Sequence, residues 1–574
     1  DPDVRRTGGG TNFFVVGPDK TAEGTPILAV DPHLPTYAPG VVYPVSITLP
    51  DDFIAGGAWV GTPAVTFGHN SRIAWGMTHL YADAEDFIIE RIDPNSADHY
   101  LTPEGPKRFK EQQVVLNGKD GSSKTVTVRS SENGIIVSDK HLYEDGVVPP
   151  PYDLAEKIYG PGHVIARRQV NTEVGLTSIQ AIVKVSRATD WNSFRDALRD
   201  FENTNNLVYA DVDGNIGVQM SARLPIREQK NGWNGQRPAR GWLGEGKWRG
   251  YVPFDELPNV YNPPKGWVAD SNSRAVNTEF AYRLTSTYSP AWRIRRAYDL
   301  MDARDDHTMD TIIDAQLDVF SGQSEWLLSR VRDLPVTSDK AKGALSLLRD
   351  WDHKMHADLP EPLLYSAFEL ALQERLVNDQ YDAVAGSNAD VLRLGRILEA
   401  DHAWCDDTRT TPKESCTDTV TAALESAVDR LSAAYGPDMS KWRWGDAHQA
   451  SFPAFFSWAH VPVLDEMTAT HIGTSGGPGT LNVGSMGRSG VPKDDLLAGL
   501  DFTQTMGSTY RMVADMSDLK NSQFMVVPGV AGNALSPHWA DQVDPWARGD
   551  YFTLQGREPK RARTTVIAAT AGTE

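Results

Sequence analysis

The chain has 574 residues, enough for several domains or for one large domain that carries insertions. Of these residues 40% are hydrophobic and 23% charged, a composition typical of a globular protein. Its 76 acidic and 56 basic side chains give a net charge of −20, which argues against nucleic acid or an anionic membrane as a partner. No apolar run approaches the ~20 residues that a membrane-spanning helix needs.

The first predicted strand follows a glycine-rich start. Gly8, Gly9 and Gly10 precede Thr11, and an apolar run begins at Phe13. Glycine leaves the backbone flexible and unshielded, so the Thr11 hydroxyl is a candidate to attack the Gly10 carbonyl. That attack would release Thr11 as a new N-terminus, whose α-amine can act as base for its own hydroxyl. The alternative is a glycine-rich linker leading into a strand, and these residues alone favour it.

The first half of the chain is predicted to be rich in β-strands. Two buried strands are expected at 12–17 and 26–31, the second ending in a loop that carries His33, and residues 57–78 contain two strands joined by a His-Asn turn. Period-two alternation over 112–137, with a turn at Asn133-Gly134, predicts hairpins. Two further strands with an Asp-Gly turn are expected within 207–218.

The composition changes near residue 292, and helices are predicted from there to about 435. Leu364, Phe368 and Leu372 recur at intervals of four, the spacing of an apolar stripe on a helix that faces a core. Strand-like segments return after residue 437. These patterns predict an α/β domain made from both ends of the chain, with a helical region inserted.

The two cysteines, Cys405 and Cys416, lie in a polar, loop-like stretch. A disulfide between them would indicate an oxidising compartment, whereas two free thiols are the alternative. A metal site is disfavoured because His402 is the one other soft ligand nearby.

Several short segments, taken together and in order, resemble the penicillin acylase family of N-terminal nucleophile hydrolases. The resemblance covers nearly the whole chain, as the large β subunit of that family. Each segment alone is weak, but the set overturns the linker interpretation of Thr11. They are residues 11–16, 31–34 (Asp-Pro-His-Leu), 67–76 (starting Phe-Gly-His-Asn), 209–217, 267–272 (Trp-Val-Ala-Asp-Ser-Asn), 507–511 and 536–542.

The resemblance implies a fold and a domain division. The fold is α+β, an αββα sandwich of antiparallel sheets with an inserted helical region. Residues 1–10 would end a spacer or pro-segment, 11–291 and 436–555 would form the catalytic domain, 292–435 the helical excursion, and 556–574 a tail.

The resemblance also implies catalytic roles. Thr11 occupies the nucleophile position, which is usually Ser in this family, so the extra methyl group puts rate and substrate range in question. His33 takes a position that contacts the nucleophile's α-amine. The backbone N–H of His79 and the side-chain amide of Asn272 match the two oxyanion donors, and such donors stabilise a tetrahedral intermediate. Arg293 matches the arginine that holds the amine end of the site, and a surface ion pair is its alternative interpretation.

An acyl pocket and a metal site follow from the same resemblance. Leu34, Phe67 and Met77 match positions of the acyl pocket, where Met77 adds bulk, so phenylacetyl need not be the preferred group. A structural Ca²⁺ would be held by the positions that match the family's calcium cluster, because a hard cation prefers oxygen ligands. These positions are Asp83, Glu85, Asp86 and the carbonyl of Pro225. A solvated acidic loop is the alternative, and residues 278–283 offer no clear further Asp.

The implied activity is hydrolysis of an N-acyl amide through an acyl-Thr11 ester, after autocatalytic cleavage between Gly10 and Thr11. The implied partner is a small α subunit from the same precursor, the implied compartment is periplasmic or extracellular, and no organic cofactor is expected. Amide synthesis at the same site, and an unprocessed homologue that only binds amides, are the alternatives.

Overall fold

The computed structural model describes residues 10–143, 146–149, 151–175, 177–277, 279–285, 288–377, 391–454, 468–487 and 495–554. The predicted spacer before Gly10 and the predicted tail 556–574 lie outside these ranges. The domain boundaries drawn from the sequence stay predictions.

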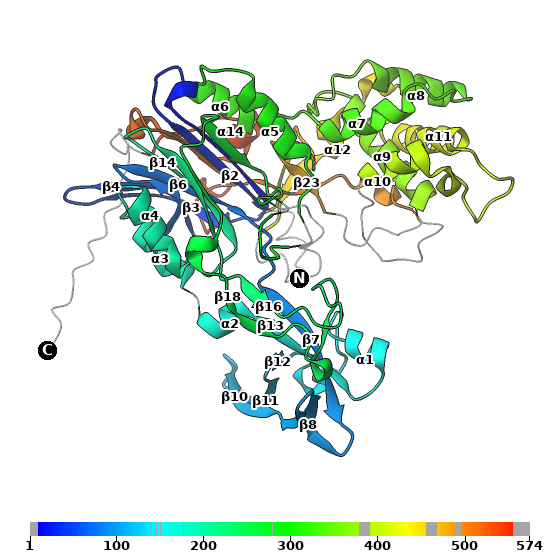
Figure 1. The fold of residues 1–574 in the computed structure, drawn as a ribbon. Coiled ribbons are helices and arrows are strands. Elements are labelled where there is room, and N and C mark those ends of the chain that lie inside the picture. The colour runs from blue at the N-terminus through cyan, green and yellow to red at the C-terminus, as the bar shows by residue number, and fades with distance from the viewer. Residues whose placement is uncertain are drawn as a thin grey trace.

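One large, mostly antiparallel sheet carries the N-terminal strand β1 in its interior (Figure 1), and only β21 and β24 pair in parallel among its described strands. Its main path runs β20-β1-β2-β24-β21-β22, and β23, β25 and β26 pair beside it. The strands are β20 (Trp267–Asp270), β1 (Gly10–Val16), β2 (Ile27–Pro35), β24 (Gln504–Ser508), β21 (Gln449–Phe452), β22 (Thr470–Gly473), β23 (Gly484–Met486), β25 (Tyr510–Asp515) and β26 (Gln523–Val526).

A second sheet packs against the first and has the order β19-β15-β14-β6-β5-β4-β3. It confirms the predicted strand pair around the His-Asn turn and the pair within 207–218. Its strands are β19 (Asn259–Tyr261), β15 (Ile216–Ser221), β14 (Asn205–Asp211), β6 (Ile73–His79), β5 (Val65–His69), β4 (Phe53–Trp59) and β3 (Val42–Thr48).

The apolar run after Thr11 exists because both faces of β1 are covered. Phe13 packs between the two sheets with Val30, Ala74 and Val208, whereas Phe14 points the other way, toward helices α5 (Trp292–Asp302) and α6 (Met309–Gln316). Alternate side chains of a strand point to opposite faces, so a strand covered on both needs an unbroken apolar sequence.

Helices complete the sandwich on its two outer faces. Helices α5 and α6 cover the first sheet, and the second is covered by α3 (Ser178–Val185) and α4 (Trp191–Ala197), whose Phe194 packs with Trp75 and Tyr209. Figure 1 shows the two helical layers on opposite sides of the strands. The predicted α+β fold with an αββα sandwich is confirmed.

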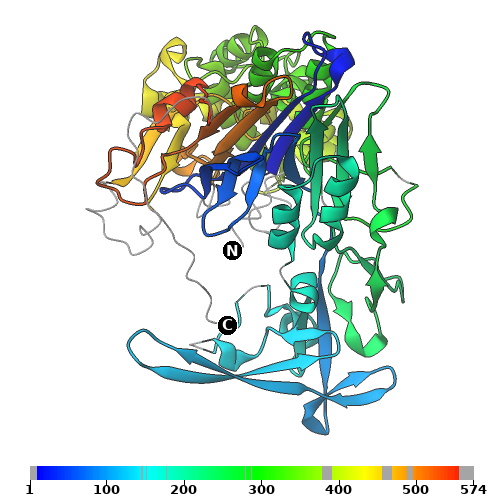
Figure 2. The ribbon, with the colours of Figure 1, turned by 90° about the vertical axis from the view of Figure 1, so that its left-hand side faces the viewer.

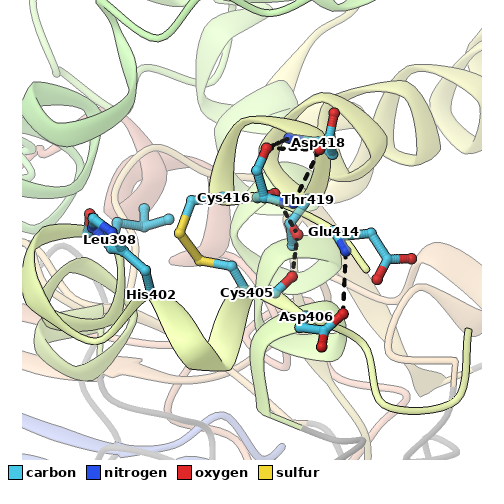
Figure 3. The surroundings of a disulfide bond; sticks show 9 residues. Leu398, His402, Cys405, Asp406, Glu414, Cys416, Asp418 and Thr419 are labelled. Atoms are coloured by element: carbon cyan, nitrogen blue, oxygen red, sulfur yellow. Dashed lines mark hydrogen bonds between the residues drawn. A yellow bond between two sulfur atoms is a disulfide. The ribbon is translucent and has the colours of Figure 1, made fainter. Parts of the chain in front are cut away.

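The region predicted to be helical is helical, but its first helices, α5 and α6, belong to the outer layer of the sandwich. The later helices form a separate group with its own buried cluster, which includes Leu364, Phe368 and Leu372 (Figure 1). Its helices are α7 (Gly322–Val331), α8 (Asp339–Arg349), α9 (Glu361–Val377), α10 (Val391–Ala400) and α11 (Cys416–Tyr435). The disulfide Cys405–Cys416 ties the start of α11 to the turn after α10 (Figure 3). Thr419 adds a hydrogen bond from its hydroxyl to the Cys405 carbonyl.

A third sheet forms an arm that projects from the sandwich (Figure 2). Its order is β10-β11-β12-β13-β7-β8-β9, with β17 beside β7, and it contains the predicted hairpins and the turn at Asn133-Gly134. Its strands are β10 (Lys110–Asn117), β11 (Ser123–Ser131), β12 (Gly134–Ile136), β13 (His163–Gln169), β7 (Glu85–Asp93), β8 (Ser96–Thr102), β9 (Gly105–Arg108) and β17 (Ala239–Arg240).

Smaller elements fill the remaining chain. The strand pair β16 (Pro225–Arg227) and β18 (Trp248–Tyr251) lies between arm and sandwich, and the short helices are α1 (Leu154–Tyr159), α2 (Val170–Val174), α12 (Trp444–Ala447) and α14 (Val543–Arg548). Across the described ranges, each helix is too short or too polar to cross a membrane.

The expectation that the second strand ends in a loop before His33 is wrong. Strand β2 continues to Pro35 because β24, from the far end of the chain, pairs with it and aligns Ser508 with His33. A polar, proline-containing sequence is therefore held as a strand by a partner that lies over 450 residues away, and His33 is buried rather than on a surface loop.

The buried His69 predicts a pH dependence of stability. Burial lowers its pKa to about 4, and its Nε2 has no hydrogen-bond partner within the described residues. The unfolded chain binds a proton near pH 6.5 and the folded one only near pH 4, so protonation favours unfolding in between. Stabilisation on the order of 3 kcal/mol should be lost as the pH falls from 6.5 to 4.

Thermal unfolding of wild type and His69→Gln across this pH range tests the prediction. The variant should show a shallower loss of melting temperature, whereas His356→Gln, at an exposed position, should follow wild type. Equal slopes in all three proteins would contradict it.

Candidate active site

Thr11 lies near the start of β1, and its backbone N–H donates to Oδ1 of Asn272 over 2.7 Å. Pairing of β1 with β2 aligns Gly10 with His33 and Asn12 with Asp31, and the side chain of Thr11 is buried. The start of β1 therefore contacts the loop after β20, although Thr11 and Asn272 are 261 positions apart in sequence.

The side-chain amide of Asn272 has a defined orientation. Its Oδ1 accepts from Thr11 N–H and from Nη2 of Arg293 (3.0 Å), and its Nδ2 donates to the carbonyl oxygen of His79 (2.8 Å). A reversed amide would place donors against donors, so Nδ2 faces the His79 peptide. Asn272 has φ of 60°, a left-handed conformation that Asn tolerates better than most residues.

Asp270 holds the turn that presents Asn272. One oxygen of Asp270 accepts from Thr78 Oγ1 and from Asn206 Nδ2, and the other accepts from the backbone N–H of Ser273. The turn is thereby tied to β6 and β14 of the second sheet. Sequence reasoning gave Asp270 no role, although it is part of the segment 267–272 that carried the resemblance.

Arg293 is buried at the N-terminal end of α5, in the interior rather than in a surface ion pair. Its Nη1 donates to Asn12 Oδ1 (2.7 Å) and to the carbonyl oxygen of Thr11 (3.4 Å), and its Nη2 contacts Asn272. Burial lowers the pKa of this guanidinium, which nevertheless stays charged because free arginine titrates so high. A positive charge therefore lies beside the backbone of Thr11.

Asn12 and Asp31 form a buried polar cluster under the nucleophile candidate, and sequence reasoning assigned neither a role. Asn12 Nδ2 donates to Asp31 Oδ2 (3.1 Å) and to the carbonyl of Leu481 (2.9 Å). Asp31 Oδ2 also accepts from Ser508 Oγ and from Nε2 of His33, both over 2.9 Å. Asp31 and Ser508 both lie in segments that carried the family resemblance, 31–34 and 507–511. These segments are so far apart in sequence that the sequence alone does not show that the two side chains touch.

The surroundings of His33 favour the neutral form of its ring and leave one ring nitrogen without a hydrogen-bond partner in the described residues. Burial lowers its pKa and outweighs the opposite effect of the hydrogen bond to Asp31. With Nε2–H donating to Asp31, Nδ1 carries the lone pair, and in the described part of the chain it has no hydrogen-bond partner. His33 thus offers a buried acceptor on the strand beside Gly10, and the positive charges of Arg293 and Arg511 oppose its protonation.

Gly10 is closely surrounded, which explains why a glycine precedes Thr11. A Cβ at this position would lie 2.2 Å from Asn272 Oδ1 and 2.9 Å from Nη2 of Arg293. These are the groups that bind Thr11, so a side chain at position 10 would displace them.

The remaining predicted site residues fall into two places. The ring of His79 is exposed and lies edge-on to Tyr81, while its carbonyl accepts from Asn272. Leu34, Phe67 and Met77 meet in the apolar cluster between the two sheets, where Phe67 packs against Tyr510. Met77 and His79 lie on the same face of β6 because they are two positions apart along the strand.

The predicted calcium ligands do not fit a calcium ion as the structure arranges them. Among the described residues, no group of three or more His, Cys, Asp or Glu side chains is placed to hold a metal. Asp83 and Asp86 instead contact Arg227, and Glu85 contacts Arg167. Ca²⁺ takes six to eight oxygen ligands, whereas here the carboxylates surround a guanidinium.

The model of the family described as penicillin amidase matches residues 2–563. The chain belongs to the penicillin amidase family. The sequence resemblance is confirmed over nearly the whole chain.

Two family relatives are similar in sequence. "Penicillin acylase 2 proenzyme" of Pseudomonas sp. (strain SE83) is 26% identical over 547 residues, covering 94% of this chain and 66% of that protein. "Acyl-homoserine lactone acylase QuiP" of Pseudomonas aeruginosa is 25% identical over 577 residues, covering 95% of this chain and 66% of that protein. The chain spans about two thirds of the length of these relatives.

A solved penicillin amidase family structure has the same fold. The thermostable penicillin G acylase from Alcaligenes faecalis is 20% identical with a TM-score of 0.71, covering 97% of this chain and all of that one. At this identity the likeness shows the fold alone.

The site predicts a specific loss of stability when the Arg293 guanidinium is removed. Arg293→Met keeps an apolar stem but deprives the buried oxygens of Asn12, Asn272 and Thr11 of their donor. Leaving buried acceptors unpaired should lower the free energy of unfolding by about 2–4 kcal/mol.

Urea unfolding of the full protein measures this loss. The control is Arg295→Met, at an exposed position of the same helix, which should stay near wild-type stability. Equal stability of the two variants would mean that the buried guanidinium is not needed for the fold.

Proposed function

We propose that this chain is the catalytic part of an acylase that hydrolyses N-acyl amides through an ester on Thr11. The observation that carries the proposal is the hydrogen bond between Thr11 N–H and Asn272 Oδ1, with Arg293 and the Asn12–Asp31–His33 cluster around it. Membership of the penicillin amidase family and the relatives named as acylases support it.

Maturation would begin at the peptide bond before Thr11. The Thr11 hydroxyl attacks the Gly10 carbonyl carbon, its proton passes to the Thr11 nitrogen, and the C–N bond breaks to leave an ester. Water then hydrolyses the ester to a Gly10 carboxylate and a free Thr11. Close packing of Gly10 against Asn272 and Arg293 would hold that carbonyl in place.

Hydrolysis would follow with the released α-amine as base. The nearby Arg293 charge favours the unprotonated amine, because a like charge disfavours the ammonium form. Thr11 Oγ attacks the carbonyl carbon of the substrate amide, and its proton passes by way of the Thr11 α-amine to the substrate nitrogen. The substrate C–N bond then breaks, which leaves an acyl-Thr11 ester and a free amine product. Asn272 Nδ2 and the His79 N–H are the proposed donors to the oxyanion. Water then releases the carboxylic acid.

The acyl group would enter the apolar region near Leu34, Phe67 and Met77. These side chains suit a hydrophobic acyl chain, and the bulk of Met77 disfavours a wide aromatic group such as phenylacetyl. The named activities of the relatives span penicillin and acyl-homoserine lactones. Assays with N-acyl amides of graded chain length and with a phenylacetyl amide would rank these groups.

A small subunit from the same precursor and a periplasmic or extracellular location belong to the same proposal. The Cys405–Cys416 disulfide supports the location, because such bonds persist in oxidising compartments.

The nucleophile assignment predicts the outcome of substitution in the full precursor. Thr11→Ala should stay uncleaved and inactive, because it lacks the attacking oxygen, whereas Thr11→Ser should be cleaved. Gly10→Ala should be cleaved slowly, because its Cβ would meet Asn272. Intact mass and N-terminal sequencing measure cleavage. Processing of Thr11→Ala at the wild-type rate without added protease would exclude Thr11 as the nucleophile.

The oxyanion assignment predicts a loss in turnover. Asn272→Ala should lower kcat by about 10²–10³ with a smaller change in KM, as expected for a group that binds the transition state. Maturation of the variant is checked first by mass, and Asn259→Ala, exposed on β19, is the control. A rise in KM alone would make Asn272 a contact of the bound substrate instead.

A further inference from the structure

The acidic loop, residues 83–86, comprises the end of the loop after β6 and the first two residues of β7. It contains three carboxylates within four residues, Asp83, Glu85 and Asp86. Such a cluster is repulsive unless positive charge lies close to it. In this chain the positive charge comes from arginines on neighbouring strands.

Arg227 on β16 lies between two of the carboxylates. Its Nε donates to Asp86 Oδ2 over 2.7 Å, and its Nη2 donates to the Asp83 carbonyl oxygen over 2.6 Å and lies 3.5 Å from the Asp83 carboxylate. The side chains of Arg227 and Asp86 are each only 5% exposed. A guanidinium buried in this way is part of the fold and not a mobile surface group.

The surroundings of this pair complete the arrangement. The indole N–H of Trp248, on the strand beside β16, donates to the same Asp86 oxygen, and the Arg227 guanidinium lies 5.7 Å from the Trp248 ring centre. Glu85 is paired separately, with two nitrogens of Arg167 on β13. Each of the three carboxylates therefore has a cation partner of its own chain.

The segment that carries Arg227 is the one expected to supply a calcium ligand through Pro225, since β16 runs from Pro225 to Arg227. The same strand thus approaches the acidic loop, and the group that it places against the carboxylates is the Arg227 guanidinium.

We propose that Arg227 serves as the resident cation of this acidic loop, and that the protein neither binds nor needs calcium there. The guanidinium links the loop after β6, which contains Asp83, to β16 and the arm strand β7. Because the same loop follows His79, the internal ion pair holds the peptide that contacts Asn272. An arginine stays charged at every physiological pH and cannot be removed by a chelator.

The test compares unfolding temperature and metal content in the full protein. Wild type should have the same melting temperature in EDTA, after gel filtration without EDTA, and with added millimolar CaCl₂, and elemental analysis should find less than stoichiometric calcium. A fall in EDTA, a rise with calcium, or one bound calcium per chain would overturn the proposal.

Variants show whether Arg227 has the role of the cation. Arg227→Met should lower the melting temperature by about 3 °C, because it leaves buried carboxylates without a partner. Adding Asp86→Asn to that variant should restore part of the loss, as expected for two groups that interact directly. Arg249→Met is the control, since Arg249 pairs with Glu228 at the surface nearby and should change little.

An Arg227→Met variant as stable as its control, or a double variant with no recovery, would contradict the role. If Arg227→Met does not fold, Arg227→Lys keeps the charge and should lie between it and wild type. All of these readouts are independent of catalysis, so they stand or fall separately from the proposed acylase activity.

Discussion

The structure depends most on the buried junction of Thr11, Asn272 and Arg293. One amide, that of Asn272, contacts the Thr11 nitrogen, the Arg293 guanidinium and the His79 carbonyl. Each group comes from a different element, so none can move alone without leaving a buried polar atom unpaired, and that loss is costly. The junction therefore joins both sheets and helix α5 at the start of β1.

Two buried carboxylates, those of Asp270 and Asp31, stabilise this junction through hydrogen bonds. Asp270 ties the Asn272 turn to the second sheet, and Asp31 collects hydrogen bonds from Asn12, His33 and Ser508 on the first. Buried polar networks of this kind fix geometry because every member restricts the next. The proposed nucleophile at the start of β1 would benefit from such rigidity, since a rigid site loses little freedom when it reacts.

In the acidic loop, too, side chains from distant segments hold one another in place, here through opposite charges. Its carboxylates would repel one another, and Arg167 on β13 and Arg227 on β16 pair with them within the fold. A family resemblance transfers the acidic residues of such a loop but not the cation that faces them. Here Arg227, two positions after the expected ligand Pro225, places a positive charge against the carboxylates.

The sequence by itself predicted several strands of the sandwich and the helices after residue 292, because apolar periodicity is a property of neighbouring residues. Its ordered short motifs made Thr11 the candidate nucleophile, through the family resemblance. It also indicated Asn272, Arg293 and His33 through the family resemblance. Only the tertiary structure decided that β2 extends through His33, that Asp31 and Asp270 support the site, and that Arg227 faces the acidic loop. Those features depend on pairs such as His33 with Ser508 and Asp86 with Arg227, which lie far apart in sequence, and no local pattern records which distant partner a side chain meets.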